Sequence, residues 1–272
     1  MHTVHVREVL PQVPAEHPNF WAIWRDVCLR YAGPVDAVFA SESYGTPLAE
    51  TLNAQYIPVD EARDLMPVSG TRVRDDPLAM WEFLPAVVRA HVVRRVCIFG
   101  PESTGKSTLA RDLASHFGTH FVHEYARPYL DRQGGVPTFE DIAAIARGQI
   151  ASEDALAPHA NRVMFCDTDV LTTTIWSDVL FGKCPPWLHD EAARRPYDLT
   201  LLLDVDVPWV QDGQRFLPDR RVEFFNRCEA ALARYGRDYA IIRGDWRERF
   251  EQSVALTRNM LSRSRTNFAR HS

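Results

Sequence analysis

The stretch Arg95-Val-Cys-Ile-Phe-Gly-Pro-Glu-Ser-Thr-Gly-Lys-Ser-Thr-Leu109 decides the fold of this chain. It contains Gly100, four further residues and then Gly105-Lys-Ser, which is the pattern of a phosphate-binding loop. The apolar run Val96–Phe99 before the loop is typical of a parallel strand that is covered on both faces. Apolar residues recur at helical spacing after the loop. Strand, loop and helix therefore come in the order that phosphate binding requires.

The residue types in this loop suit a nucleotide. Gly100 and Gly105 allow a tight turn whose N–H groups point at phosphate oxygens. Lys106 can reach the β- and γ-phosphates, and the Ser107 hydroxyl can ligate Mg²⁺. A glycine-rich turn with an exposed lysine is the alternative, and the flanking strand and helix disfavour it. We expect ATP and Mg²⁺ as cofactors, with the nucleotide bound by Gly100, Pro101, Glu102, Ser103, Thr104, Gly105, Lys106, Ser107 and Thr108.

Composition restricts the class of protein. The 272 residues carry a formal net charge of -5, which argues against nucleic acid or a membrane surface as partner. No stretch approaches the length of a membrane-spanning helix. The five cysteines are scattered and form no Cys-x-x-Cys pair, so we expect reduced thiols and a cytoplasmic location.

Two α/β domains are predicted, with a boundary near residue 93. Before it, a helix after Asn19 is followed by strands over 35–40 and 55–59, and residues 78–93 are predicted to be helical. The domains are therefore expected at 1–93 and 94–262, with a basic tail at 263–272.

The second domain is predicted to contain a five-stranded parallel sheet with the phosphate-loop strand in its middle. By analogy with phosphate-loop kinases, the strand order is second, third, first, fourth, fifth. The predicted strands are Val96–Phe99, His120–His123, Val163–Cys166, Leu199–Leu203 and Tyr239–Ile242, with a helix over 138–157.

Carboxylates follow three of these strands, at the edge where parallel sheets bind ligands. Asp167 follows the third strand, where a residue that organises Mg²⁺ is needed. Glu124 or Asp169 can accept the proton of an attacking hydroxyl. Asp204 follows the fourth strand. A capped or solvated strand end is the alternative for each carboxylate taken singly.

The segment Pro208–Arg221 is predicted to be a lid over the phosphates. Arg215 and Arg221 can stabilise the charge that phosphoryl transfer spreads over the equatorial oxygens. A solvated basic loop is the alternative. Four aromatic residues are candidates for stacking on a substrate ring, although each is more often a packing residue: Tyr125, Tyr129, Trp176 and Trp187.

A second anion site is predicted at Ser69-Gly-Thr-Arg-Val-Arg74, where two hydroxyl side chains and two arginines begin a helix. A capped surface helix has the same pattern, so both readings stay open on spacing alone.

Taken together, these motifs resemble the NadR-type bifunctional proteins of NAD salvage. Residues 95–262 are similar to their ribosylnicotinamide kinase domain, and residues 35–93 to the second half of their nicotinamide mononucleotide adenylyltransferase domain. The resemblance rests on the phosphate loop, Glu124-Tyr-Ala-Arg127, Asp167-Thr-Asp169 and the lid, and in the first domain on Ser69–Arg74 and Leu84–Arg89.

The resemblance implies a kinase that moves the ATP γ-phosphoryl group to the ribose 5′-hydroxyl of nicotinamide riboside, its small-molecule partner. It implies catalytic roles for Lys106, Glu124, Asp167, Arg215 and Arg221, Mg²⁺ binding by Ser107 and Asp167, and substrate binding by Glu124, Tyr125, Arg127, Asp169, Trp209 and Asp212. A regulatory nucleotide-sensing ATPase is the alternative from another class.

The chain departs from that family in its first domain. The family's Gly-x-Phe-x-Pro-x-His-x-Gly-His motif, whose histidines act on the ATP phosphates, does not occur in this sequence. We therefore expect a partial, Rossmann-like nucleotidyltransferase domain without useful adenylyltransferase activity, rather than a bifunctional enzyme.

Overall fold

The computed structural model describes residues 13–195, 197–213 and 215–263. The chain divides into two compact units, Met1–Ser69 and Gly70–Ser272. This division lies before the predicted boundary at residue 93, because Trp81, Leu84 and Val92 are buried in the core of the second unit. Apart from Arg263, the predicted tail at 263–272 lies outside the described residues.

The first unit has the predicted strand–helix–strand arrangement. Its strands pair in parallel, with Ala37 opposite Gln55 and Ala40 opposite Pro58. The first helix ends at Gly33, whose φ of 71° lies in the left-handed region that glycine tolerates. The elements of this unit are α1 Phe20–Ala32, β1 Ala37–Ala40, α2 Gly45–Leu52 and β2 Gln55–Pro58.

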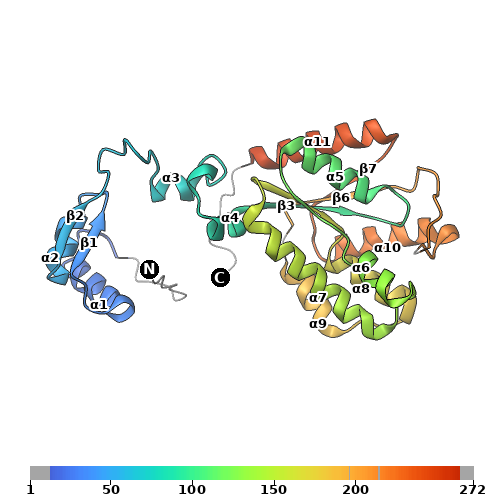
Figure 1. The fold of residues 1–272 in the computed structure, drawn as a ribbon, viewed down its shortest axis with the longest axis horizontal. Helices are drawn as coiled ribbons and strands as arrows, with labels where there is room; N and C mark the ends of the chain where they lie inside the picture. Colours follow the sequence, from blue (N-terminus) through green and yellow to red (C-terminus); the bar gives the residue numbers. More distant parts are fainter. Residues whose placement is uncertain (1–12, 196, 214, 264–272) are drawn as a thin grey trace. The chain divides into compact units, whose positions relative to one another are not determined.

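The second unit, in which Figure 1 labels β3, β6 and β7, is built on a five-stranded sheet. The strand order is β4-β5-β3-β6-β7. All its neighbouring strands are parallel. In chain order this is second, third, first, fourth, fifth, so the predicted topology is confirmed and the phosphate-loop strand lies in the centre. The strands are β3 Arg94–Phe99, β4 Phe121–Val122, β5 Val163–Asp167, β6 Leu199–Leu203 and β7 Tyr239–Ile242.

Helices cover both faces of this sheet (Figure 1). Alternate residues of β3 point to opposite faces: Cys97 and Phe99 pack under the α7–α10 layer, whereas Val96 and Ile98 pack under α5 and α11. The helices are α5 Lys106–Phe117, α6 Ala126–Gln133, α7 Phe139–Leu156, α8 Val170–Phe181, α9 Pro186–Arg194, α10 Arg221–Arg234 and α11 Trp246–Ser262, with short η2 Ala157–His159 and η3 Pro218–Arg220.

Residues 70–93 differ from the prediction of one helix over 78–93. They form α3 Gly70–Asp75, the single turn η1 Trp81–Phe83 and α4 Ala86–Val92. Pro85 precedes α4 with extended backbone, which ends the turn and starts a new helix. Sequence reasoning also missed α6. In the described part of the chain, no helix combines the length and the apolar character needed to cross a bilayer.

Candidate active site

The phosphate loop connects the end of β3 to the start of α5. Gly100 and Gly105 have φ of 132° and 85°, conformations that residues with a Cβ rarely adopt. A Cβ on Gly100 would lie 2.8 Å from the carbonyl oxygen of Leu203, so the adjacent strand also excludes a side chain here. Ser103 adopts a left-handed conformation too, with φ of 58°. Local turn geometry and strand packing therefore both require glycine at position 100.

The loop leaves amide groups for a ligand. Among the residues that the structure describes, none accepts a hydrogen bond from the N–H groups of residues 102–105. Two carbonyl oxygens of the loop are instead bound by guanidinium groups: Arg221 donates to Ser103 at 3.3 Å and Arg249 donates to Thr104 at 2.9 Å. Unpaired N–H groups at the start of a helix attract an anion, as the predicted phosphate site requires.

Lys106 is the first residue of α5 and remains within the loop. Its Nζ donates to the carbonyl oxygen of Pro101 at 2.7 Å, and the Thr104 hydroxyl donates to the same oxygen at 2.8 Å. A phosphate group would give this ammonium a stronger, charge-assisted partner than a neutral carbonyl.

Asp167 ends β5 beside the phosphate loop, opposite Ile98 in the sheet register. Only 2% of the residue is exposed, and its Oδ1 has no hydrogen-bond partner among the described residues. Burial, and after it the negative charge of Glu124, raise the pKa of this carboxyl to about 6 against the opposing effects of Lys106 and the Ser107 hydroxyl. A buried carboxylate oxygen without a partner, next to a hydroxyl, is a donor set that suits Mg²⁺.

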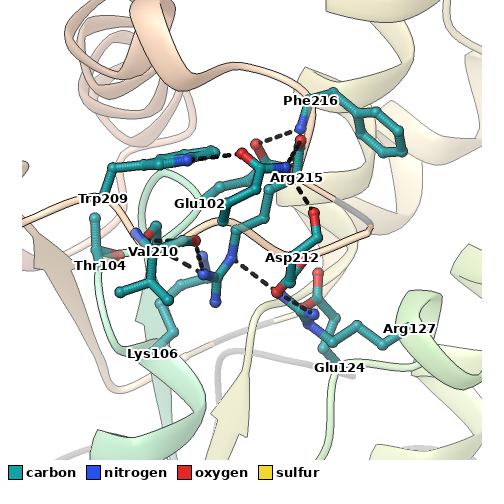
Figure 2. A network of polar contacts seen from close by, with 12 residues as sticks. Glu102, Thr104, Lys106, Glu124, Arg127, Trp209, Val210, Asp212, Arg215 and Phe216 are labelled. Atoms are coloured by element: carbon teal, nitrogen blue, oxygen red, sulfur yellow. Dashed lines mark hydrogen bonds and ion pairs between the residues drawn. The ribbon is translucent and has the colours of Figure 1, made fainter.

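Glu124 lies after β4 and pairs with Arg127 at 3.2 Å. Arg127 in turn pairs with Asp212 at 3.1 Å, and Asp212 pairs with Arg215 at 3.0 Å. Figure 2 shows this chain of ion pairs, which runs from the end of β4 to the lid segment (residues 208–221). Four residues that the sequence analysis proposed for the site are therefore in mutual contact.

The lid segment is bound to the phosphate loop by polar contacts, drawn in part in Figure 2. The Glu102 carboxylate accepts from the N–H groups of Phe216 and Leu217, at 3.0 and 3.2 Å. The Ser103 hydroxyl accepts from the N–H of Val210 at 2.7 Å. Arg215 donates to the carbonyl of Val210. Glu102 and Ser103 thus connect loop and lid through side chains, which their prediction as nucleotide-binding residues did not include.

A cavity begins at the phosphate loop and extends beneath α6, α7 and α8. Charged side chains of Glu102, Lys106, Glu124 and Arg127 line it together with apolar ones. Such a cavity suits a ligand with a polar part beside the phosphates and a flat or apolar part away from them. Its other lining residues are Ala126, Leu130, Pro137, Ile142, Ile145, Gln149, Thr168, Thr172, Thr173, Trp176, Leu180 and Phe216.

Asp169, which was predicted to bind substrate, lies at the start of α8. It is 1% exposed, caps α8 by accepting from the N–H of Thr172 at 3.0 Å, and pairs with Arg237 at 3.3 Å. Burial raises the pKa of its carboxyl. The cap and the ion pair both use this carboxylate, and Asp169 is not among the residues that line the cavity.

Three other residues that were predicted to bind substrate do not line the cavity. The ring of Tyr125 rests on Gly148 of α7, where a Cβ would approach it to 2.1 Å, and the N–H of Tyr125 donates to Gln149 at 3.0 Å. The indole N–H of Trp209 donates to the side-chain oxygen of Gln211. The guanidinium carbon of Arg221 lies 5.8 Å from the centre of the Trp209 ring. Asp212 acts through the ion pairs described above.

Of the remaining aromatic candidates, one lines the cavity and two do not. Trp176 lines the cavity. Trp187 packs against Arg147, and the hydroxyl of Tyr129 donates to Asp141 at 2.8 Å. Asp204 accepts from Arg243 at 2.6 Å and takes no part in the cavity. Helical spacing gave no way to select Trp176 among them.

Sequence reasoning missed several residues of the site. Gln149 lies on α7 and holds the turn after β4, and Thr172 and Thr173 line the cavity from α8. Arg249 and Trp246 of α11 contact the phosphate loop from a distant part of the chain. The local signal for Gln149 was a polar residue at helical spacing from Ile142, Ile145 and Ala146, on a face that also buries Glu153.

The predicted anion site at Ser69–Arg74 remains a prediction. Gly70–Asp75 forms the short helix α3, in which Arg74 donates to the Thr71 hydroxyl at 3.2 Å. This contact occurs equally in a capped surface helix.

Comparison with known proteins supports the resemblance drawn from the motifs. The chain is 32% identical over 261 residues to the trifunctional NAD biosynthesis/regulator protein NadR of Escherichia coli (strain K12). This match covers 92% of the present chain and 64% of that relative, so the chain spans less than two thirds of its length.

Two crystal structures of NadR share the fold at 21% identity. One, in complex with NR, has a TM-score of 0.73 over 96% of this chain and 78% of that chain. The other, in complex with NAD and AMP-PNP, has a TM-score of 0.71 over 93% of this chain and 76% of that chain. The NadR-like character predicted from the motifs is therefore confirmed.

The phosphate loop, the carboxylates and the whole lid segment fall within one family match. The model of that family, described as an AAA domain, matches residues 95–249, more than half of the chain. By this match the chain belongs to the AAA-domain family.

Proposed function

We propose that this chain is an ATP-dependent kinase that phosphorylates the ribose 5′-hydroxyl of nicotinamide riboside to give nicotinamide mononucleotide. One observation carries the proposal: Lys106 of the phosphate loop and Glu124 line the same cavity, which continues into an apolar region containing Trp176. A phosphoryl donor at the loop would thus face an acceptor whose hydroxyl lies near Glu124. The similarity to NadR supports nicotinamide riboside as that acceptor.

The donor end is proposed to hold ATP with Mg²⁺. Ser107 and Asp167 would hold the ion, because the Asp167 Oδ1 is buried without a hydrogen-bond partner among the described residues. When bound, Mg²⁺ neutralises charge on the β- and γ-phosphates. The N–H groups of the loop and the ammonium of Lys106 would bind the phosphate oxygens.

At the acceptor end, Glu124 is proposed to accept the proton of the 5′-hydroxyl. The hydroxyl oxygen forms the new bond to the γ-phosphorus, the bond from that phosphorus to the bridging oxygen breaks, and ADP leaves. Asp169, the other base considered from the sequence, is occupied by its cap and its ion pair. The ion pair with Arg127 orients the Glu124 carboxylate.

The lid is proposed to complete the site with Arg215 and Arg221. Both guanidinium groups already contact the phosphate loop, Arg215 at the Ser103 hydroxyl and Arg221 at the Ser103 carbonyl. In the reaction they would stabilise the charge that develops on the equatorial oxygens of the transferring group.

A cytoplasmic location and a nucleotidyltransferase-like first unit are also proposed. Cys97, Cys166 and Cys228 are free and buried, which suits a reducing compartment such as the cytoplasm. The parallel strand–helix–strand of the first unit is compatible with a nucleotidyltransferase-like domain.

The proposal is tested with a panel of nucleosides as acceptors, measuring ADP release and the phosphorylated product by mass spectrometry. We expect little ADP release from the protein with ATP and Mg²⁺ alone, and a large increase with nicotinamide riboside. ADP release that is independent of every nucleoside would instead support a regulatory ATPase. Strong turnover with another nucleoside only would keep the reaction and replace the acceptor.

A further inference from the structure

Trp246 is exposed at the phosphate loop, where the proposed reaction gives it no role. It is the first residue of α11, and 58% of its surface is accessible, which is unusual for a tryptophan in a helix that packs on a sheet. Its six-membered ring lies against Gly105: a Cβ added to that glycine would approach the ring to 2.3 Å. The loop glycine therefore makes room for an aromatic side chain as well as for a turn.

Trp246 packs against the guanidinium group of a buried arginine, Arg249. Arg249, one turn further along α11, is 1% exposed and places its guanidinium 5.7 Å from the centre of the Trp246 ring. The same guanidinium donates to the carbonyl oxygens of Thr104, Gly244 and Asp204 at 2.9, 2.9 and 3.0 Å. Ring, cation and loop are thus in direct contact with one another, and the rest of the ring remains accessible.

Trp246 lies away from the acceptor cavity. It does not line that cavity, but it lines a separate small hollow with Gly105, Thr108 and Leu203. Thr108 follows Ser107 on the first turn of α5. The acceptor cavity lies on the side of the phosphate loop where Glu124 and Trp176 line it. A nucleotide with its phosphates in the loop must therefore direct its nucleoside elsewhere, and the Trp246 surface is an aromatic surface at the loop outside that cavity.

We infer that Trp246 is the stacking surface for the adenine base of the donor nucleotide. This inference rests on the proposed function, in which ATP is the donor. A purine presents a flat π-face, and stacking on an aromatic side chain contributes about 1–3 kcal/mol per base. Such a contact adds affinity for the nucleotide without touching the atoms that react. Trp246 is thus a binding residue that determines preference for a base-bearing donor.

The experiment compares two probes in equilibrium binding by calorimetry with Mg²⁺: AMP-PNP, which carries the base, and tripolyphosphate, which does not. Trp246→Ala is expected to weaken AMP-PNP binding roughly 5- to 100-fold and to leave tripolyphosphate binding unchanged. Trp246→Phe keeps an aromatic face and should bind AMP-PNP within about threefold of the unmodified chain. Arg247→Ala is the matched control, since that side chain is 84% exposed on the same turn of α11.

Two results would overturn the inference. One is unchanged AMP-PNP binding by Trp246→Ala, or no AMP-PNP binding by the chain at all. The other is an equal loss for both probes, which would show that Trp246 only supports the loop. Neither measurement depends on phosphoryl transfer. A chain that binds AMP-PNP through Trp246 but phosphorylates no nucleoside would refute the proposed kinase and leave this inference standing.

Discussion

Arg249 donates a hydrogen bond of 2.9 Å to the carbonyl oxygen of Thr104, which is 145 residues away in the sequence. The bond connects the first turn of the last helix to the centre of the phosphate loop. Arg249 also pairs with Asp206, so one buried guanidinium holds the loop, the end of β6 and the start of α11 together. The shape of the phosphate loop therefore depends on a residue outside its motif.

Replacing Arg249 with leucine should destabilise the second unit by about 3 kcal/mol or more. The change leaves buried carbonyl oxygens and the Asp206 carboxylate without their cation, and breaking a buried charged network typically costs that much. Thermal or urea unfolding measures the effect. Arg247→Leu is the control, because its ion pair with Glu251 is exposed and worth little. Equal stability of the two variants would show that Arg249 is not needed to hold the loop.

Lys106→Ala should lower the turnover number roughly 10²- to 10³-fold while the fold persists. Among the described residues the ammonium of Lys106 donates only to the carbonyl oxygen of Pro101 in its own loop, so we expect its loss to remove charge at the phosphates rather than structural hydrogen bonds. Steady-state kinetics and circular dichroism separate the two effects. Lys183→Ala, which removes an ammonium above the ring of Phe139, should leave turnover unchanged.

Arg215→Ala should lower turnover more than affinity for ATP. In the structure its guanidinium contacts Asp212 and the carbonyl of Val210, and we expect it to turn to the transferring phosphoryl group only during reaction. Turnover is compared with AMP-PNP affinity in the same variant. Parallel losses in both would indicate that Arg215 merely holds the lid in shape.

Asp167→Asn should stabilise the metal-free protein above about pH 6. Burial raises the pKa of Asp167 from 3.8 to about 6, so folding favours the protonated form and ionisation costs native stability. This cost is absent below pH 3.8, grows as the pH rises and reaches about 3 kcal/mol above pH 6. Melting temperatures from pH 4 to 8 in chelator should converge at the acid end. Asp112→Asn, at an exposed ion pair, should show no such trend.

Asp167 and Glu124 should respond differently to Mg²⁺. Activity of Asp167→Asn should be partly restored by raising Mg²⁺, because the variant weakens the proposed metal site next to Ser107. Glu124→Gln should raise the KM for nicotinamide riboside and slow turnover with an unchanged Mg²⁺ requirement, because Glu124 lies in the acceptor cavity. Identical Mg²⁺ titrations for both variants would contradict this division of roles.

The sequence by itself determined the phosphate loop and the parallel sheet. The loop needs glycine at positions 100 and 105, where φ is 132° and 85°, so its conformation depends on residues close together in the sequence. Each strand of the sheet is a short apolar run, and chain order combined with the analogy to phosphate-loop kinases predicted the topology that the structure shows. Such features depend on neighbours along the chain, which spacing reports directly.

Only the tertiary structure decided which polar residues belong to the site. Asp167 and Asp169 are two residues apart at the end of the same strand. Among the described residues, one buried oxygen of Asp167 has no hydrogen-bond partner, whereas Asp169 caps a helix and pairs with Arg237. The contacts of Arg249 and Trp246 with the loop arise from the packing of α11 on the sheet. That packing determines contacts between residues more than a hundred positions apart, such as Arg249 and Thr104, and the spacing of residues along the sequence does not predict them.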